Sequence, residues 1–192
     1  MKTNFEKMLS GEVYDSRDPK LLELYHQARR LILAYNNSDS KDQELRQQLL
    51  NQLLGKIENG VWIESPFFCD YGINIEIGEN TFVNTNCMFL DDNKIRIGKN
   101  VLIAPYVQIY TATHPLKASD RIYQEGNNTR YHTSTKPVTI GDNVWIGGNS
   151  VIFPGVTIGN NVTIGAGSVV TKDIPDDVLA FGNPCVVQKI LK

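Results

Sequence analysis

The sequence predicts a mostly β protein: a parallel β-helix of six-residue repeats preceded by an N-terminal α-helical hairpin. Two observations carry this prediction. Isoleucine or valine occupies every sixth position from Ile140 to Val170, and glycine follows four of these six anchors. Before about residue 60, apolar residues instead follow helical spacing. A fixed short period with one aliphatic anchor, and with Gly, Asn or Asp between anchors, is typical of a hexapeptide β-helix.

The composition of the chain argues against some classes of partner. The chain has 192 residues, 41% hydrophobic, with 19 basic and 21 acidic side chains and a formal charge of −2. This balance argues against a nucleic-acid partner, which favours a basic excess. The sequence has no apolar run long enough to span a membrane and no secretory leader, so we expect no membrane partner. Its three widely spaced cysteines fit reduced thiols and a cytoplasmic location.

Residues 1–58 form the predicted helical segment. Asp18 and Pro19 provide an N-cap and a first-turn proline, and apolar residues from Leu21 to Tyr35 share one face. A second helix is expected to start at a capping box of Ser40 and Gln43.

The β-helix is predicted over residues 59–187, with a C-terminal tail at 188–192. Anchors fall into four groups of three, which predicts four triangular coils; the earliest group starts at Ile77. The spacing lengthens to 31 residues between Ile109 and Ile140, so a loop of about 112–137 is expected to leave the helix there.

The chain resembles the left-handed β-helix acyltransferases, and in particular their maltose/galactoside O-acetyltransferase branch. The resemblance rests on the helical N-terminus, Asp91-Asp92, Ala112-Thr113-His114-Pro115-Leu116 and Val144-Trp145-Ile146-Gly147. It implies a left-handed helix and acetyl transfer from acetyl-CoA directly to a sugar hydroxyl in a ternary complex. It also implies a homotrimer with active sites between subunits, and no metal.

An alcohol becomes a good nucleophile only when its proton is removed, and imidazole suits this task at neutral pH. Of the three histidines, His26 lies in the first predicted helix and His132 in a polar run, whereas His114 lies where the insertion begins. The family motif makes His114 the general base. The resemblance also makes Asn84 the residue that stabilises the tetrahedral intermediate and positions the acceptor.

The resemblance assigns Asp92 to acceptor binding. Asp70 stands where relatives often carry serine, which suggests a more acidic acceptor pocket that favours a different sugar or an amine-bearing molecule.

The coenzyme side is expected on the last two coils. Small residues let a pantetheine arm approach the backbone, and lysines neutralise phosphates as point charges. Val186 replaces an arginine of the galactoside enzymes, and Lys189 takes the place of a second one. The resemblance assigns coenzyme contacts to Trp145, Gly147, Gly148, Ala166, Thr171, Lys172 and Lys189.

Other functions remain open from the sequence. The same fold serves antibiotic (xenobiotic) O-acetyltransferases, and a β-helix can also be a non-catalytic scaffold. A carbonic anhydrase needs three metal-binding histidines, whereas only His114 and His132 lie in the repeat region.

Overall fold

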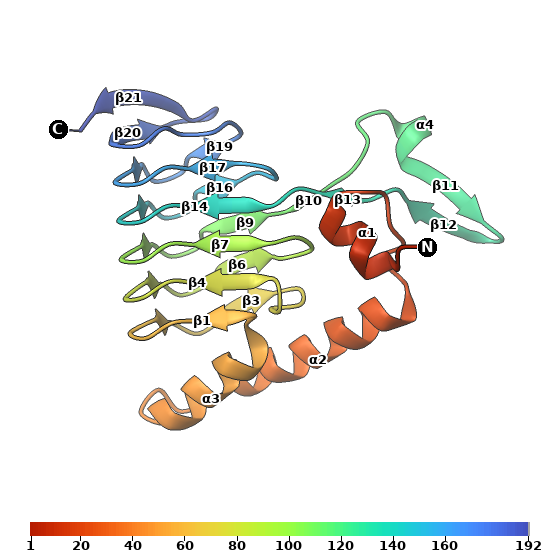
Figure 1. The fold of residues 1–192 in the computed structure, drawn as a ribbon, viewed down its shortest axis with the longest axis horizontal. Helices are drawn as coiled ribbons and strands as arrows, with labels where there is room; N and C mark the ends of the chain where they lie inside the picture. The colour runs from red at the N-terminus through yellow and green to blue at the C-terminus, as the bar shows by residue number, and fades with distance from the viewer. Residues whose placement is uncertain (192) are drawn as a thin grey trace.

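The computed structural model describes residues 1–191 and forms a triangular β-solenoid with helices at its N-terminal end (Figure 1). Three sheets, parallel except for the last strand β21, make the sides of the prism. Sheet 1 contains β1 (Lys56–Ile57), β4 (Ile75–Ile77), β7 (Ile95–Ile97), β14 (Val138–Ile140) and β17 (Thr157–Ile158). Sheet 2 contains β2 (Trp62–Ile63), β5 (Phe82–Val83), β8 (Leu102–Ile103), β15 (Trp145–Ile146), β18 (Thr163–Ile164), β20 (Val178–Phe181) and β21 (Val186–Ile190). Sheet 3 contains β3 (Phe67–Cys69), β6 (Cys87–Leu90), β9 (Gln108–Tyr110), β16 (Val151–Ile152) and β19 (Val169–Val170).

The predicted mostly β solenoid with an N-terminal helical region is confirmed, but the expected four coils are wrong. Each of five complete coils supplies one strand to each sheet, and a sixth coil begins at Ile174, which bridges Ile158, and continues into β20. The additional coil is the first, whose anchors are Ile57, Ile63 and Cys69. It pairs in register with the second coil, for example Ile63 with Val83 and Cys69 with Phe89. Its first strand begins at Lys56, inside the segment assigned to the helices.

The anchors fill the inside of the prism. The side chains of the anchors Ile109, Ile146 and Ile158 are completely buried, and each stacks on the anchor of a neighbouring coil. Burying one such side chain contributes roughly 1.5–3 kcal/mol, so the regular stack is the main source of stability.

Asparagine makes the corner between sheets 1 and 2. Asn100, Asn143 and Asn161 have φ values of 56°, 57° and 56°, in the left-handed region that asparagine tolerates better than most residues. Their side chains form a ladder along the solenoid: the amide of Asn100 donates to Asn143 over 3.1 Å, and Asn143 donates to Asn161 over 2.9 Å. The corner residues therefore satisfy the backbone conformation and link neighbouring coils.

Three helices precede the solenoid rather than the two expected: α1 (Asn4–Ser10), α2 (Pro19–Asn36) and α3 (Gln43–Leu53). Asp18 caps α2 as predicted, by accepting the N–H of Lys20. The N-cap of α3 is Asp42 and not Ser40, because the Asp42 carboxylate accepts the N–H of Leu45 over 3.1 Å.

Helices α2 and α3 close the open end of the first coil. Arg46 is only 4% exposed and donates over 2.8 Å to the Tyr35 hydroxyl and over 3.0 Å to the Ile63 carbonyl. The Asn36 amide pairs with both backbone groups of Phe67, at 3.0 and 2.9 Å. These side chains provide the hydrogen bonds that a preceding coil would otherwise supply.

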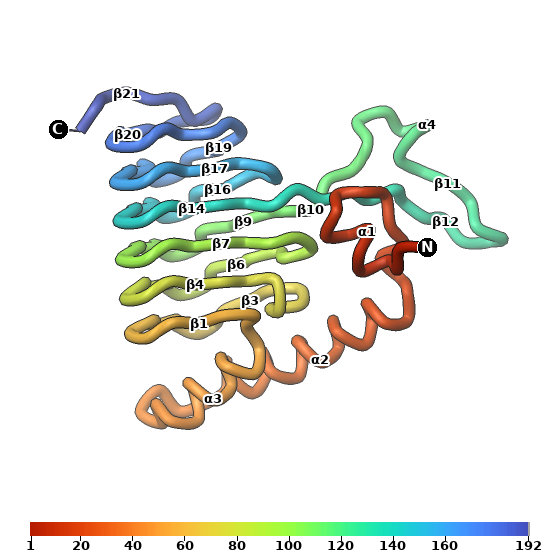
Figure 2. The backbone as a smooth tube through the Cα atoms, viewed as in Figure 1, coloured from red at the N-terminus to blue at the C-terminus, as the bar shows by residue number. Residues whose placement is uncertain are grey.

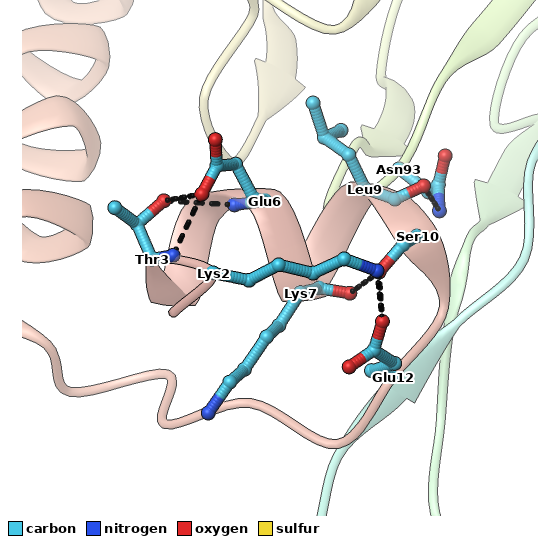
Figure 3. A network of polar contacts seen from close by, with 8 residues as sticks. All are labelled: Lys2, Thr3, Glu6, Lys7, Leu9, Ser10, Glu12 and Asn93. Atoms are coloured by element: carbon cyan, nitrogen blue, oxygen red, sulfur yellow. Dashed lines mark hydrogen bonds and ion pairs between the residues drawn. The ribbon is translucent and has the colours of Figure 1, made fainter.

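Helix α1 is fixed against the solenoid at the base of the insertion (Figure 3). Thr3 and Glu6 form a capping box at its start. At its end, the Asn93 amide donates to the carbonyls of Met8 and Leu9, both at 3.2 Å. The chain between α1 and α2 is consequently held beside the insertion.

The insertion is an ordered arm rather than an irregular loop, and it projects from the side of the prism (Figure 2). Strands β10 (Ala112–Thr113) and β13 (Ser134–Thr135) pair at its base. Beyond them lie α4 (Ala118–Arg121) and an antiparallel hairpin of β11 (Ile122–Glu125) and β12 (Asn128–Tyr131).

Strand β21 turns back to pair with β20, so most of the expected tail at 188–192 belongs to sheet 2. Lys192, the last residue of that tail, lies outside the described residues. Within residues 1–191, every helix is too short or too polar to cross a bilayer.

Candidate active site

His114 lies directly after β10, where the arm leaves the third coil. Its Nδ1 is 2.9 Å from the carbonyl oxygen of His132. A carbonyl oxygen can only accept, so Nδ1 of the neutral ring carries the proton and the lone pair resides on Nε2. The His114 side chain is exposed, and the ring is held in an orientation that leaves Nε2 able to take a proton.

His132 has a different role. Its own Nδ1 lies 2.8 Å from the Asp120 carbonyl, and its ring stacks on Tyr123 with centroids 4.5 Å apart. His132 therefore stabilises the arm and orients His114 through its main-chain carbonyl.

A hollow of about 140 Å³, here called the arm pocket, opens beside His114. Besides His114, it is lined by Asp15, Ser16, Arg17, Tyr123, Arg130, Tyr131 and Thr133. A larger hollow of about 270 Å³ lies against sheet 1 between charged side chains such as Glu76 and Arg96, which pair with each other at 3.4 Å. It contains none of the predicted site residues, so the arm pocket is the better candidate for chemistry.

Asp92 is linked to the His114 segment through Tyr14. The Tyr14 hydroxyl donates to Asp92 Oδ1 over 2.8 Å, and the Tyr14 backbone N–H donates to the Thr133 carbonyl over 3.3 Å. Tyr14 is only 4% exposed. Burial raises the pKa of the Asp92 carboxyl, while the hydrogen bond from Tyr14 opposes that rise.

Asp70 lies one coil below Asp92, at the equivalent corner. Burial and the nearby Asp92 charge raise the pKa of Asp70 to about 6, and the Arg29 guanidinium, 3.0 Å away, opposes the rise. Because Arg29 already pairs with this carboxylate, the geometry does not favour the amine-bearing acceptor that Asp70 suggested.

Asp91 supports this corner from inside. Its side chain is fully buried and accepts the backbone N–H groups of Asp70 (2.9 Å), Tyr71 (2.8 Å) and Asn74 (3.2 Å). Burial raises the pKa of Asp91 to about 7, although hydrogen bonds from backbone N–H groups such as those of Tyr71 and Asn74 oppose the rise. No group of three or more His, Cys, Asp or Glu side chains in residues 1–191 is arranged to hold a metal ion.

The predicted residues fall on two separate edges of the prism. The first edge is the corner that joins sheet 3 to sheet 1 of the next coil. Its predicted residues each follow a strand of sheet 3, or β10, which extends that sheet: Asp70, Asp92, His114, Thr171 and Lys172.

The second edge is the corner that joins sheet 2 to sheet 3, together with the adjoining strands of sheet 2. Asn84 follows β5, Gly147 and Gly148 follow β15, and Ala166 follows β18. Gly147 packs closely on the next coil: a Cβ there would lie 2.4 Å from the Ala166 nitrogen. Trp145 is 54% exposed on β15, and Lys189 is on β21, opposite Leu179 of β20.

Sheet 3 separates these edges. Strand β6, four residues long, lies between Asn84 and Asp92 and spans roughly 13 Å at about 3.3 Å per residue. Groups that act on one reacting centre must come within roughly 3 Å of it. One copy of the chain therefore does not bring His114 and Asn84 to the same centre.

Tyr14 and Arg29 contact the candidate carboxylates and Arg130 lines the arm pocket, although sequence reasoning did not identify these three residues. Tyr14 and Arg29 lie in the N-terminal segment, more than 40 residues from the carboxylates they contact. In the sequence, only their aromatic or basic side chains indicated a functional role. No spacing of residues placed them near the corner that carries Asp70 and Asp92.

Known proteins match both the helical segment and the solenoid. The family model "maltose acetyltransferase hexapeptide capping motif" matches residues 7–58, and "hexapeptide repeat of succinyl-transferase" matches residues 137–172. Galactoside O-acetyltransferase of Escherichia coli is 40% identical over 182 residues, covering 95% of this chain and 86% of the relative.

Solved structures extend the likeness over the whole chain. A maltose O-acetyltransferase from Clostridium difficile superimposes with a TM-score of 0.90 at 47% identity, covering 100% of this chain and 98% of that one. A hexapeptide-repeat acetyltransferase from Vibrio cholerae, complexed with acetyl coenzyme A, has a TM-score of 0.88 at 40% identity and covers both chains completely.

The fold and these relatives define an acyltransferase of the β-solenoid class. The chain belongs to the hexapeptide-repeat acetyltransferases, in the maltose/galactoside O-acetyltransferase family. The prediction of an acetyl-CoA-dependent acetyltransferase is confirmed at the level of the family.

Proposed function

We propose that this enzyme transfers an acetyl group from acetyl-CoA directly to a sugar hydroxyl, with His114 as general base. The observation that carries the proposal is the 2.9 Å contact between His114 Nδ1 and the His132 carbonyl. It leaves Nε2 as the basic nitrogen beside a pocket that can hold the acceptor.

The reaction has two parts. Nε2 of His114 takes the acceptor hydroxyl proton as the oxygen attacks the thioester carbonyl, which gives a tetrahedral oxyanion. The C–S bond then breaks, and the imidazolium returns its proton to the coenzyme thiolate. This sequence balances protons without any further reactant.

Asn84 supplies the oxyanion donor. Its Oδ1 accepts the Thr85 N–H over 2.7 Å, so the side-chain amide is oriented and its NH₂ group is the one available to donate. A neutral donor stabilises the oxyanion without competing for the proton.

Asp92 and Asp70 orient the acceptor. The Tyr14 hydroxyl donates to one oxygen of Asp92, and the Arg29 guanidinium donates to one oxygen of Asp70. The remaining carboxylate oxygens accept hydroxyl groups of the sugar, because an ionised carboxylate has about four acceptor positions.

The coenzyme lies along the second edge. The small residues Gly147, Gly148 and Ala166 let its pantetheine arm approach the backbone, and exposed Trp145 packs against it. Lys189, together with Thr171 and Lys172 of the first edge, provides polar and cationic contacts for the coenzyme.

A homotrimer completes the site, because it brings the first edge of one copy against the second edge of the next. The outer face of sheet 2 supports such an assembly. Trp62, Phe82, Leu102 and Trp145 stand in register on successive strands, and three of them are exposed by 39%, 52% and 54%. Three equivalent clefts then form around a threefold axis.

We also place the enzyme in the cytoplasm, where its three free cysteines stay reduced.

A turnover screen tests this function. Purified enzyme is supplied with acetyl-CoA and either simple sugars or hydroxyl-bearing antibiotics, and release of the coenzyme thiol is followed. We expect turnover with sugars. Turnover with antibiotics alone would favour the xenobiotic enzyme, and calorimetry showing no binding at millimolar coenzyme would favour the scaffold.

A further inference from the structure

Two arginines contribute to the lining of the arm pocket. Arg17 and Arg130 line it together with a single carboxylate, Asp15. One oxygen of Asp15 already accepts the backbone N–H of Arg17 over 2.9 Å. The pocket therefore presents two guanidinium groups beside the proposed base.

Arg130 is held in place but incompletely paired. Its Nε and Nη2 contact the same oxygen of Glu125, at 2.9 and 2.7 Å, and its side chain is only 18% exposed. Its remaining nitrogen, Nη1, is buried and has no hydrogen-bond partner within residues 1–191. Arg130 is therefore fixed in the wall of the pocket, and one of its nitrogens makes no hydrogen bond within residues 1–191.

Aromatic side chains complete the wall of the pocket. Tyr123 and Tyr131 line it, and Tyr123 is braced by the stacked ring of His132. Flat aromatic faces next to a few convergent polar groups are typical of small-molecule sites, and a pyranose ring offers a matching apolar face.

We infer that the acceptor is an anionic saccharide, whose carboxylate or phosphate is bound by Arg130 and Arg17 while a hydroxyl reaches His114. This inference rests on the proposed function, since it names the substrate class of the same site. Both anions carry oxygens that accept charge-assisted hydrogen bonds from guanidinium groups.

The test compares kcat/KM for three acceptors at saturating acetyl-CoA: a neutral hexose, its 1-phosphate and the corresponding hexuronic acid. We expect the wild-type enzyme to favour at least one anionic sugar over the hexose by about tenfold or more, the usual value of a charge-assisted hydrogen bond. The phosphate and the uronic acid separate the two possible anions.

Arg130→Gln should lower this preference by about tenfold, and Arg130→Lys, which keeps the charge but not the fork, should lower it less. Arg30→Gln is the matched control, because Arg30 is an exposed arginine of α2 outside the arm pocket. It should leave the preference unchanged. The KM of wild-type enzyme for the anionic sugar should also rise with ionic strength, a measurement that needs no variant.

Efficient turnover of the hexose with no preference for either anion would overturn this inference and leave the proposed function standing. An anion preference that survives in folded Arg130→Gln enzyme would overturn it as well. Absence of turnover with every sugar would overturn the proposed function and this inference together.

Discussion

Replacing His114 with alanine removes the proposed base and little else. The ring is exposed and makes one close hydrogen bond, to the His132 carbonyl at 2.9 Å. Losing a single exposed hydrogen bond costs about 1 kcal/mol or less, so the solenoid should remain folded. The catalytic loss should be far larger, because a positioned acid–base group contributes roughly 10²–10⁴-fold to the rate.

The assay measures kcat and the KM for acetyl-CoA with a sugar acceptor, alongside thermal unfolding. We expect His114→Ala to lower kcat by roughly 10²–10⁴-fold, with the KM for acetyl-CoA nearly unchanged. Its melting temperature should stay within a few degrees of the wild type.

His132→Ala is the matched control, because it keeps the main-chain carbonyl that orients His114. It should retain activity within a few-fold. A fully active His114→Ala enzyme together with an inactive but folded His132→Ala enzyme would refute the assignment.

Two further predictions concern the coenzyme and the carboxylates. Lys172→Ala and Lys189→Ala should each raise the KM for acetyl-CoA and leave kcat mostly unchanged, because each removes a contact made equally in the ground and transition states. An unchanged KM for Lys189→Ala at low salt would rule out the proposed role of Lys189. The pKa of the Asp70 carboxyl is raised from 3.8 to about 6 in the folded state. Ionisation of Asp70 therefore does not affect folding stability below about pH 4, and it lowers the free energy of unfolding as pH rises through 6. Asp70→Asn should therefore gain about 2–3 kcal/mol of unfolding free energy relative to the wild type between pH 4 and pH 7, and equal pH profiles in urea titrations would contradict this.

The sequence predicted the solenoid well where its period was regular. Anchors such as Ile146 and Ile158 are visible because one buried position recurs every sixth residue. The first coil was missed because Cys69 stands in for an aliphatic anchor. Helix α1 was missed because it is only seven residues long and buries a single side chain, Met8.

The candidate site was predictable only in part. His114 and Asn84 were assigned through motifs that the family resemblance supplied, and their roles stay predictions. The contacts of Tyr14 with Asp92 and of Arg29 with Asp70 join positions 78 and 41 residues apart, and no local pattern encodes them. The division of the site between two edges also required the structure, because the corner that a residue occupies depends on the number and register of the coils.

We propose that each active site takes His114 from one copy and Asn84 from its neighbour. The most direct test of this proposal is to unfold and refold an equal mixture of His114→Ala and Asn84→Ala chains, each inactive alone. Random assembly of cyclic trimers gives about a quarter of all clefts both functional residues, so the mixture should recover about a quarter of wild-type activity. Refolded trimers of confirmed mixed composition that show no recovered activity would contradict the shared site.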